Sequence, residues 1–271
     1  YFEERAKGGA GLIITGANVV STKYEPRPCT ELSDFHHVER LNMLIERCHA
    51  YGAKVCVQLS PGLGRQQFTD PFTPPYSAGS VGAFWFPDLI CKPFSKEDIH
   101  YLVEKVGYSA SLAVNAGADC VELHAYGGYL LDQFHSVQWN NRTDEYGGDI
   151  HGRLRLTLEV IEEVRKQCGR DFIIDVRISG DEYSDGGLTL NDMIYVSKQL
   201  EKATVDFIHV SGGNTIKKGS SMPASGTAPA PHKHASEEIK KHVSIPVATV
   251  SRINEPWVAD ELIANGVCDA C

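Results

Sequence analysis

Short apolar runs alternate along the chain with longer segments of helical periodicity. The runs are rich in Val, Ile and Leu and nearly continuous, as is typical of strands covered on both faces of a sheet. We expect strands at residues 11–15, 54–59, 119–124, 172–178, 207–210, 245–250 and 267–271. Helices are predicted between them, at residues 1–7, 34–51, 95–116, 152–168, 190–202 and 255–265.

This alternation predicts an α/β fold with a parallel sheet built from right-handed βαβ units. An open dinucleotide-binding sheet would carry a GxGxxG motif after an early strand, and the sequence has none there. A (β/α)8 TIM barrel is therefore favoured. Seven strands are one short of eight, the chain opens in a helix and it stops inside a strand. We expect a barrel truncated at both ends, with its first strand absent and its last strand incomplete, formed by residues 1–271 as one domain.

Composition and charge narrow the class of protein. The 271 residues carry a net charge of −9, so a basic surface for nucleic acid is not expected. The apolar runs are too short to cross a membrane, and the first residues lack the pattern of a signal peptide. Eight cysteines are scattered along the chain, which favours free thiols in a reducing cytoplasm over a disulfide framework.

Polar side chains stand where several of the predicted strands end. Gln58, His124 and Arg177 would share the C-terminal face of a barrel, where active sites are built. An amide, an imidazole and a guanidinium suit a flat heteroaromatic ligand with several hydrogen-bonding edges. Small residues after two later strands are candidates for a phosphate site, at Gly212-Gly213 and Ser251-Arg252. The long connections 60–94 and 211–234 follow strands and are expected to be functional loops.

The segment that follows the fourth strand carries a family resemblance. His124-Ala125-Tyr126-Gly127-Gly128-Tyr129-Leu130-Leu131-Asp132-Gln133-Phe134, followed by Asn141-Arg142-Thr143-Asp144-Glu145-Tyr146-Gly147-Gly148, resembles the signature of the old yellow enzyme family. That resemblance implies an FMN-dependent ene-reductase on a (β/α)8 barrel, with NAD(P)H as electron donor. The segment 242–254 resembles the branch of 2,4-dienoyl-CoA reductase and the clostridial 2-enoate reductases.

The resemblance assigns cofactor-binding residues by position. Gln58 matches the glutamine that binds the flavin pyrimidine ring, and Ala17 matches the small residue beside it. Arg177 matches the arginine near flavin N1, and Ser251 and Arg252 match a phosphate-binding turn. The branch further implies a [4Fe–4S] cluster and an NADH/FAD-binding region, which are expected beyond residue 271 in the full-length protein.

The resemblance also assigns two catalytic residues. Tyr129 matches the tyrosine that protonates the substrate carbon, and His124 matches the first member of the pair that holds the substrate carbonyl oxygen. Gly127 departs from the pattern, because many relatives carry His or Asn there. A glycine cannot donate a side-chain hydrogen bond, so carbonyl activation would depend on His124 or on a residue from elsewhere.

The sequence predicts reduction of the C=C bond of a small α,β-unsaturated carbonyl compound, such as an enoate, a dienoyl-CoA or a steroid-like enone. An amine dehydrogenase of the same family is an alternative, with Tyr126, Trp85 and Phe86 as a substrate cage. A metal-dependent barrel hydrolase that uses His124 and His209 is a second alternative, although no metal is expected. A non-catalytic barrel fragment is a third. A homo-oligomer is possible, and neither a nucleic acid nor a membrane is expected as partner.

Overall fold

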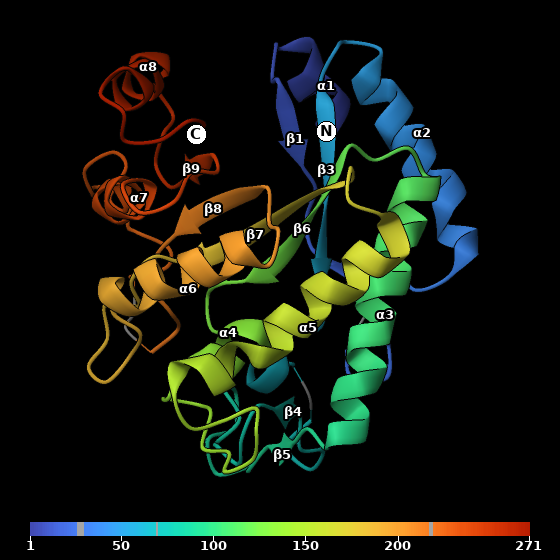
Figure 1. Ribbon diagram of the computed structural model, residues 1–271, viewed down its shortest axis with the longest axis vertical. Helices are drawn as coiled ribbons and strands as arrows, with labels where there is room; N and C mark the ends of the chain where they lie inside the picture. Colours follow the sequence, from blue (N-terminus) through green and yellow to red (C-terminus); the bar gives the residue numbers. More distant parts are fainter. Residues whose placement is uncertain (26–29, 69, 217–218) are drawn as a thin grey trace.

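A single parallel sheet that curls around one of its faces forms the centre of the computed structural model, which describes residues 1–25, 30–68, 70–216 and 219–271 (Figure 1). Neighbouring strands follow one another in chain order and are all parallel: β1 (Leu12–Ile14), β3 (Lys54–Ser60), β6 (Cys120–Ala125), β7 (Ile173–Ser179), β8 (Phe207–Ser211) and β9 (Val247–Thr249). The two-residue strand β2 (Asn18–Val19) also pairs with β3. Within the described residues β1 and β9 are the two edges of this sheet. The α/β prediction and the strand order of a TIM barrel are confirmed.

Helices connect the strands and pack on the outer face of the sheet. Their bounds are α1 (Phe2–Lys7), α2 (Val38–His49), α3 (Lys96–Asn115), α4 (Leu130–His135), α5 (Ile150–Cys168), α6 (Leu190–Lys202), α7 (Lys233–Lys240) and α8 (Pro256–Ala264). The longest begins where capping chemistry predicts it. The Ser95 side chain accepts a hydrogen bond from the Asp98 N–H, and the Asp98 carboxylate accepts one from the Ser95 N–H. Such reciprocal caps satisfy N–H groups that the first helical turn leaves free.

The two faces of the sheet differ in chemistry. Along β6 the residues Val121, Leu123 and Ala125 are fully buried against the helices. The residues between them, Glu122 and His124, point to the opposite face, because side chains alternate along a strand. The same alternation recurs along β3, β7 and β8. The central strands are therefore apolar only toward the helices, and the concave face is polar. The prediction of strands covered on both faces is confirmed for β6, whose residues are all buried, although its concave face is polar.

Two further predictions need correction. At the C-terminal end only Ala270 pairs, in a single parallel bridge with Ala248 of β9, so the strand expected at 267–271 is reduced to one bridge. Helix α7 was not expected, because its eight residues are mostly polar and only Ala235, Ser236 and Ile239 are buried. With Ala235 and Ile239 as its buried apolar residues, a segment of eight residues is too short for its periodicity to stand out in the sequence.

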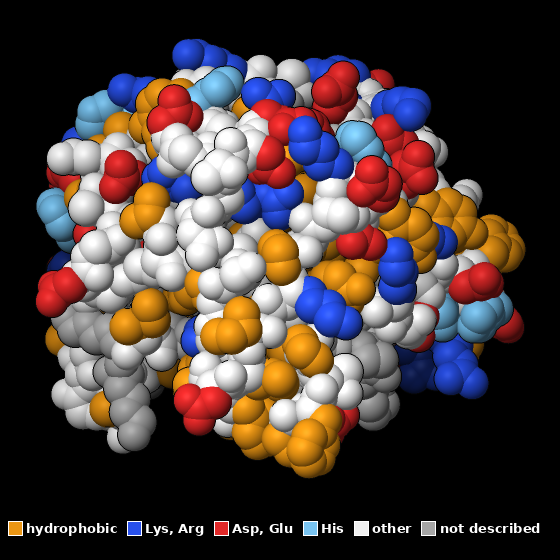
Figure 2. All heavy atoms as spheres, turned by 90° about the horizontal axis from the view of Figure 1, so that it is seen from below, with side chains coloured by type: hydrophobic (Ala, Val, Ile, Leu, Met, Phe, Trp, Pro, Cys, Tyr) orange, Lys and Arg blue, Asp and Glu red, His pale blue; other side chains and the backbone are white. Residues whose placement is uncertain are grey.

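The long connection after β3 lies at the end of the molecule where the strands of the sheet end (Figure 1). It contains the short parallel pair β4 (Tyr76–Ser77) and β5 (Lys92–Pro93). It also exposes the large apolar side chains Phe72, Trp85 and Ile90. Figure 2, which views the molecule from below Figure 1, shows apolar side chains gathered on this face and charged ones toward one edge. Among the described helices, none combines the length and the hydropathy that a membrane span requires.

Candidate active site

The strand ends bring the three main sequence candidates onto the same concave face. His124 of β6 lies directly opposite Arg177 of β7 in the parallel register. Gln58 of β3 lies opposite Glu122, two residues before His124 and therefore on the same face. The amide, the imidazole and the guanidinium thus come from neighbouring strands. The predicted convergence of these residue types at one end of the sheet matches the structure.

His124 is buried between polar and aromatic neighbours. Its ring centroid lies 5.0 Å from that of Tyr129 and 5.8 Å from that of Tyr126. Burial, together with the positive charge of Arg177, lowers the pKa of His124 to about 4, although Glu122 acts in the opposite direction. The imidazole is therefore neutral near pH 7 and can donate one N–H. Burial and the neighbouring Tyr126 raise the pKa of Tyr129, so its hydroxyl keeps its proton.

Two buried nitrogen atoms at this end of the sheet lack a hydrogen-bond partner among the described residues. Nδ1 of His124 and Nε of Arg177 make no hydrogen bond with any residue that the structure describes. The guanidinium carbon of Arg177 lies 4.5 Å from the ring centroid of Tyr126. Buried polar atoms normally find hydrogen-bond partners, so unpaired nitrogens beside an aromatic ring fit a bound heteroaromatic group such as FMN.

The backbone of Gln58 is held by Thr15, directly after β1, and by Asn18, the first residue of β2. Its N–H donates to Oγ1 of Thr15 at 3.0 Å, and its carbonyl oxygen accepts from Nδ2 of Asn18 at 3.0 Å. Asn18 also donates to Oγ1 of Thr15 at 3.0 Å. Ala17 lies within the turn between β1 and β2, and its role beside the ring stays a prediction. Sequence reasoning did not identify Asn18, although a polar residue so soon after a strand end is a signal that could have found it.

The turn between His124 and Tyr129 is built from two glycines with positive φ. Gly127 has φ +76° and Gly128 has φ +77°. The Gly127 carbonyl accepts a hydrogen bond from Nε2 of Gln66 at 3.0 Å, and the Gly128 N–H donates to Oδ2 of Asp132 at 2.7 Å. Glycine adopts this conformation without strain, and because it has no side chain it offers no side-chain donor at position 127.

The connection after β8 lies over the same end of the sheet. The Tyr126 hydroxyl donates to the carbonyl of Ser221 at 3.0 Å. The Gly213 N–H donates to the carbonyl of Asp181 at 2.7 Å. The Gly213 N–H is therefore not available to a ligand. At Gly212 an added Cβ would lie 2.5 Å from the His232 ring. A phosphate at this turn would have to use other donors than the Gly213 N–H.

The second predicted phosphate turn has an unusual backbone. Ser251 and Arg252, which follow β9 after Val250, have φ values of +94° and +52°. Consecutive non-glycine residues in this region are strained, and such strain gathers at functional sites. Nε of Arg252 donates to the carbonyl of Thr227 at 2.8 Å, so this turn is tied to the connection after β8. The phosphate role of both residues stays a prediction.

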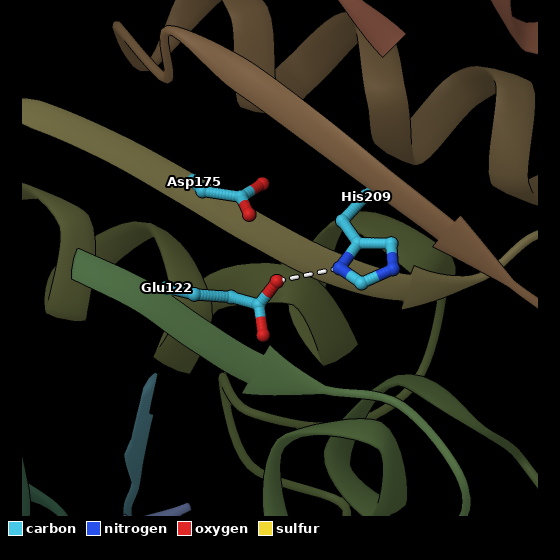
Figure 3. A group of neighbouring side chains, drawn as sticks. All are labelled: Glu122, Asp175 and His209. Atoms are coloured by element: carbon cyan, nitrogen blue, oxygen red, sulfur yellow. Dashed lines mark hydrogen bonds and ion pairs between the residues drawn. The ribbon is translucent and has the colours of Figure 1, made fainter. Parts of the chain in front are cut away.

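The polar face holds three further residues that sequence reasoning did not assign to the ring site. Figure 3 shows Glu122, Asp175 and His209 from three adjacent strands pointing toward one another. Nδ1 of His209 lies 2.6 Å from Oε2 of Glu122. The signal that could have found them is a period of two, with polar residues at every second position of β6, β7 and β8.

The placement of these residues bears on the two alternatives. His209 is paired with Glu122, and in the register Arg177 stands between His209 and His124. A permanent cation between two intended ligands disfavours the metal site that the hydrolase alternative requires. For the amine cage, Tyr126 contacts His124 and Arg177, whereas Trp85 packs on Phe68 and Phe84. Tyr126 and Trp85, two of the three residues expected to form the cage, therefore pack against different side chains.

Comparison with known proteins decides the family. The model of the NADH:flavin oxidoreductase / NADH oxidase family matches residues 1–270. The chain belongs to this family. The resemblance to the old yellow enzyme family is therefore confirmed.

Individual members of the flavin oxidoreductase family are similar along the whole chain. A cinnamate reductase from Clostridium sporogenes is 33% identical over 296 residues, which cover 99% of this chain and 44% of that protein. An NADPH dehydrogenase from Halalkalibacterium halodurans is 33% identical over 271 residues, which cover 99% of this chain and 76% of that protein. This chain thus spans less than half the length of the cinnamate reductase.

The fold is also that of solved members of the family. The structure of the old yellow enzyme homologue from Zymomonas mobilis matches with a TM-score of 0.79 at 24% sequence identity. The match covers all of this chain and 76% of that one. At this identity the likeness supports the barrel fold and not a shared substrate.

Proposed function

We propose that residues 1–271 are the FMN domain of an NAD(P)H-dependent oxidoreductase that reduces the C=C bond of an α,β-unsaturated carbonyl compound. The observation that carries the proposal is the convergence of Gln58, His124 and Arg177, with unpaired buried nitrogens on the last two. The similarity to a protein named cinnamate reductase supports an unsaturated substrate. Within that class, an enoate, a dienoyl-CoA and a steroid-like enone stay open.

The residues present fit a bound flavin, which supplies a hydride to the substrate carbon when it is in place. Gln58 and Ala17 would hold the pyrimidine edge. Arg177 would stabilise negative charge that develops at that edge, since its guanidinium is permanently protonated and its Nε is unpaired. Ser251 and Arg252, with Gly212, would hold the phosphate, whereas the N–H of Gly213 is already bonded to Asp181.

Two side chains would act on the substrate. The neutral imidazole of His124 donates one N–H to the carbonyl oxygen and withdraws electrons from the adjacent C=C bond. The Tyr129 hydroxyl, which stays protonated at neutral pH, donates its proton to the α-carbon. The two rings are 5.0 Å apart, close enough to act on neighbouring atoms of one small molecule. With glycine at position 127, His124 is the side-chain donor expected on the oxygen.

The test is direct. The purified full-length protein is titrated with FMN by fluorescence, and the loaded protein is then mixed with NAD(P)H and an enoate or enone. We expect stoichiometric FMN binding and loss of the substrate C=C bond. A protein that takes up no FMN would refute the proposal. A [4Fe–4S] cluster and an FAD region beyond residue 271, a homo-oligomer and a cytoplasmic location stay predictions.

A further inference from the structure

Gln58, the residue expected to hold the flavin pyrimidine ring, has its side chain anchored from below. Its Nε2 donates a hydrogen bond to Oε1 of Glu122. The second oxygen of Glu122, Oε2, is bonded to Nδ1 of His209 at 2.6 Å. Glu122 is fully buried, and Gln58 and His209 are nearly so. A carboxylate removed from water thus connects β3 to β8 directly beneath the proposed ring site (Figure 3).

The charge state of Glu122 decides which way the Gln58 amide faces. Burial alone would raise the pKa of Glu122, but the charge of His209 and the hydrogen bonds from His209 and Gln58 help to lower it to about 2. An ionised carboxylate only accepts hydrogen bonds. The Gln58 amide must therefore turn its NH2 group to Glu122, because the opposite orientation would bring two oxygens together. Its carbonyl oxygen is then left for another donor.

Asp175 completes the arrangement from the neighbouring strand. It lies opposite Glu122 in the register, and neither of its carboxyl oxygens has a hydrogen-bond partner among the described residues. Burial and the charge of Glu122 hold the pKa of Asp175 well above its ordinary value. A protonated Asp175 places no second negative charge beside Glu122, so Glu122 keeps its own.

We propose that Glu122 is a positioning residue that fixes the Gln58 amide with its carbonyl oxygen toward the bound ring, so that the site selects a ring edge carrying an N–H donor. The inference rests on the proposed FMN site, whose imide edge carries such an N–H. Glu122 does not touch the ring itself. It acts through Gln58, and His209 and Asp175 hold it in the ionised state.

A metal ion is the competing explanation for this cluster. Ligand atoms of Glu122, Asp175 and His209 lie within 4.8 Å of one another, which is close enough for a shared ion. However, both oxygens of Glu122 already accept hydrogen bonds, from Gln58 and His209. Asp175 retains a proton that a cation would have to displace. Hydrogen bonding therefore accounts for Glu122 and His209 without an ion.

The test combines a variant with a double-mutant cycle. In Glu122→Gln the new amide oxygen accepts from His209, so its NH2 group faces Gln58 and turns the Gln58 carbonyl away from the ring. The affinity for FMN is then expected to fall about 10- to 100-fold, the range for a lost hydrogen bond that leaves its buried partners unpaired. In a Gln58→Leu background the same change is expected to have no further effect, because Glu122 then has no amide to orient. Glu159→Gln is the matched control. Glu159 accepts a hydrogen bond from the Tyr146 hydroxyl at 2.9 Å and takes no part in the proposed site.

A second measurement needs no variant and remains available if Glu122→Gln fails to fold. The wild-type protein is titrated with FMN methylated at the imide nitrogen, which removes the N–H donor, and a large loss of affinity is expected. Equal affinity for both flavins would overturn the inference. So would an equal loss from Glu122→Gln with and without Gln58, or a stoichiometric metal ion that only wild type holds. A wild type that binds no FMN would instead refute the proposed function.

Discussion

His124 and Arg177 face each other across β6 and β7, and the guanidinium charge helps to hold the imidazole neutral. Burial makes the larger contribution to this effect, and together they lower the pKa of His124 to about 4. A neutral imidazole can donate a hydrogen bond to a substrate carbonyl throughout the physiological pH range. The same pairing has a consequence for stability that can be measured without any substrate.

The free energy of unfolding should fall as the pH drops from about 6.5 to 4. In this range the unfolded chain protonates His124 while the folded protein does not, so the unfolded state binds more protons and is favoured by acid. The shift from 6.5 to about 4 corresponds to a loss on the order of 3 kcal/mol. Urea unfolding at pH 7, pH 5 and pH 4 measures it, with about 2 kcal/mol of the loss expected by pH 5. His124→Gln should flatten this pH dependence in part, because the buried His135 also contributes through a pKa lowered to about 3.

Replacing Arg177 should change the electron affinity of the bound flavin. Arg177→Met removes a positive charge and a hydrogen bond from the edge where negative charge develops, so the reduction potential should fall. A charge-assisted hydrogen bond is worth about 1.5–3 kcal/mol, which corresponds to tens of millivolts for a two-electron couple. Spectroelectrochemical titration of the loaded variant gives the shift. Arg170→Met, on the surface beside Asp206, is the control. An unchanged potential in folded Arg177→Met would place this arginine away from the ring.

The sequence predicted the order of elements well, because apolar runs and helix caps are local signals. Six of the expected strands are present, and Gln58, His124 and Arg177 do reach the same end of one sheet. The pairing of Glu122 with His209 could not be predicted, since these residues lie 87 positions apart and meet only through the register of three strands. Likewise, the use of the Gly213 N–H by Asp181 depends on how two loops pack, which periodicity does not encode.

Gly127 should resist replacement for reasons of backbone conformation. Its φ of +76° lies in the left-handed region, where the backbone of a residue with a Cβ is strained by about 1–2 kcal/mol. An added Cβ would approach the Tyr129 ring no closer than 3.7 Å, so collision is not the cause. Gly127→Ala should therefore lower the free energy of unfolding by about that amount in urea titrations. Gly11→Ala is the matched control, because an added Cβ there meets nothing within 4 Å and its φ lies outside this region. Equal effects of both changes would contradict the argument.

The two catalytic assignments separate when the half-reactions are timed independently. Tyr129→Phe should slow flavin reoxidation by the unsaturated substrate by about 10²–10⁴-fold, the contribution of a positioned acid. Flavin reduction by NAD(P)H should keep its rate, because no proton reaches the substrate carbon in that half. His124→Ala should also weaken the binding of phenols that mimic the carbonyl oxygen, since His124 acts on that oxygen.

The matched control for Tyr129 is Tyr126→Phe. It removes a hydroxyl that is bonded to Ser221 and leaves the Tyr129 hydroxyl in place, so its reoxidation rate should stay close to that of wild type. Stopped-flow absorbance of the flavin follows both half-reactions. If Tyr129 only packs its ring against His124, the Phe variant would reoxidise at the wild-type rate. In that case a large effect of Tyr126→Phe would move the acid role to the neighbouring hydroxyl, because both rings lie within 6 Å of the His124 ring.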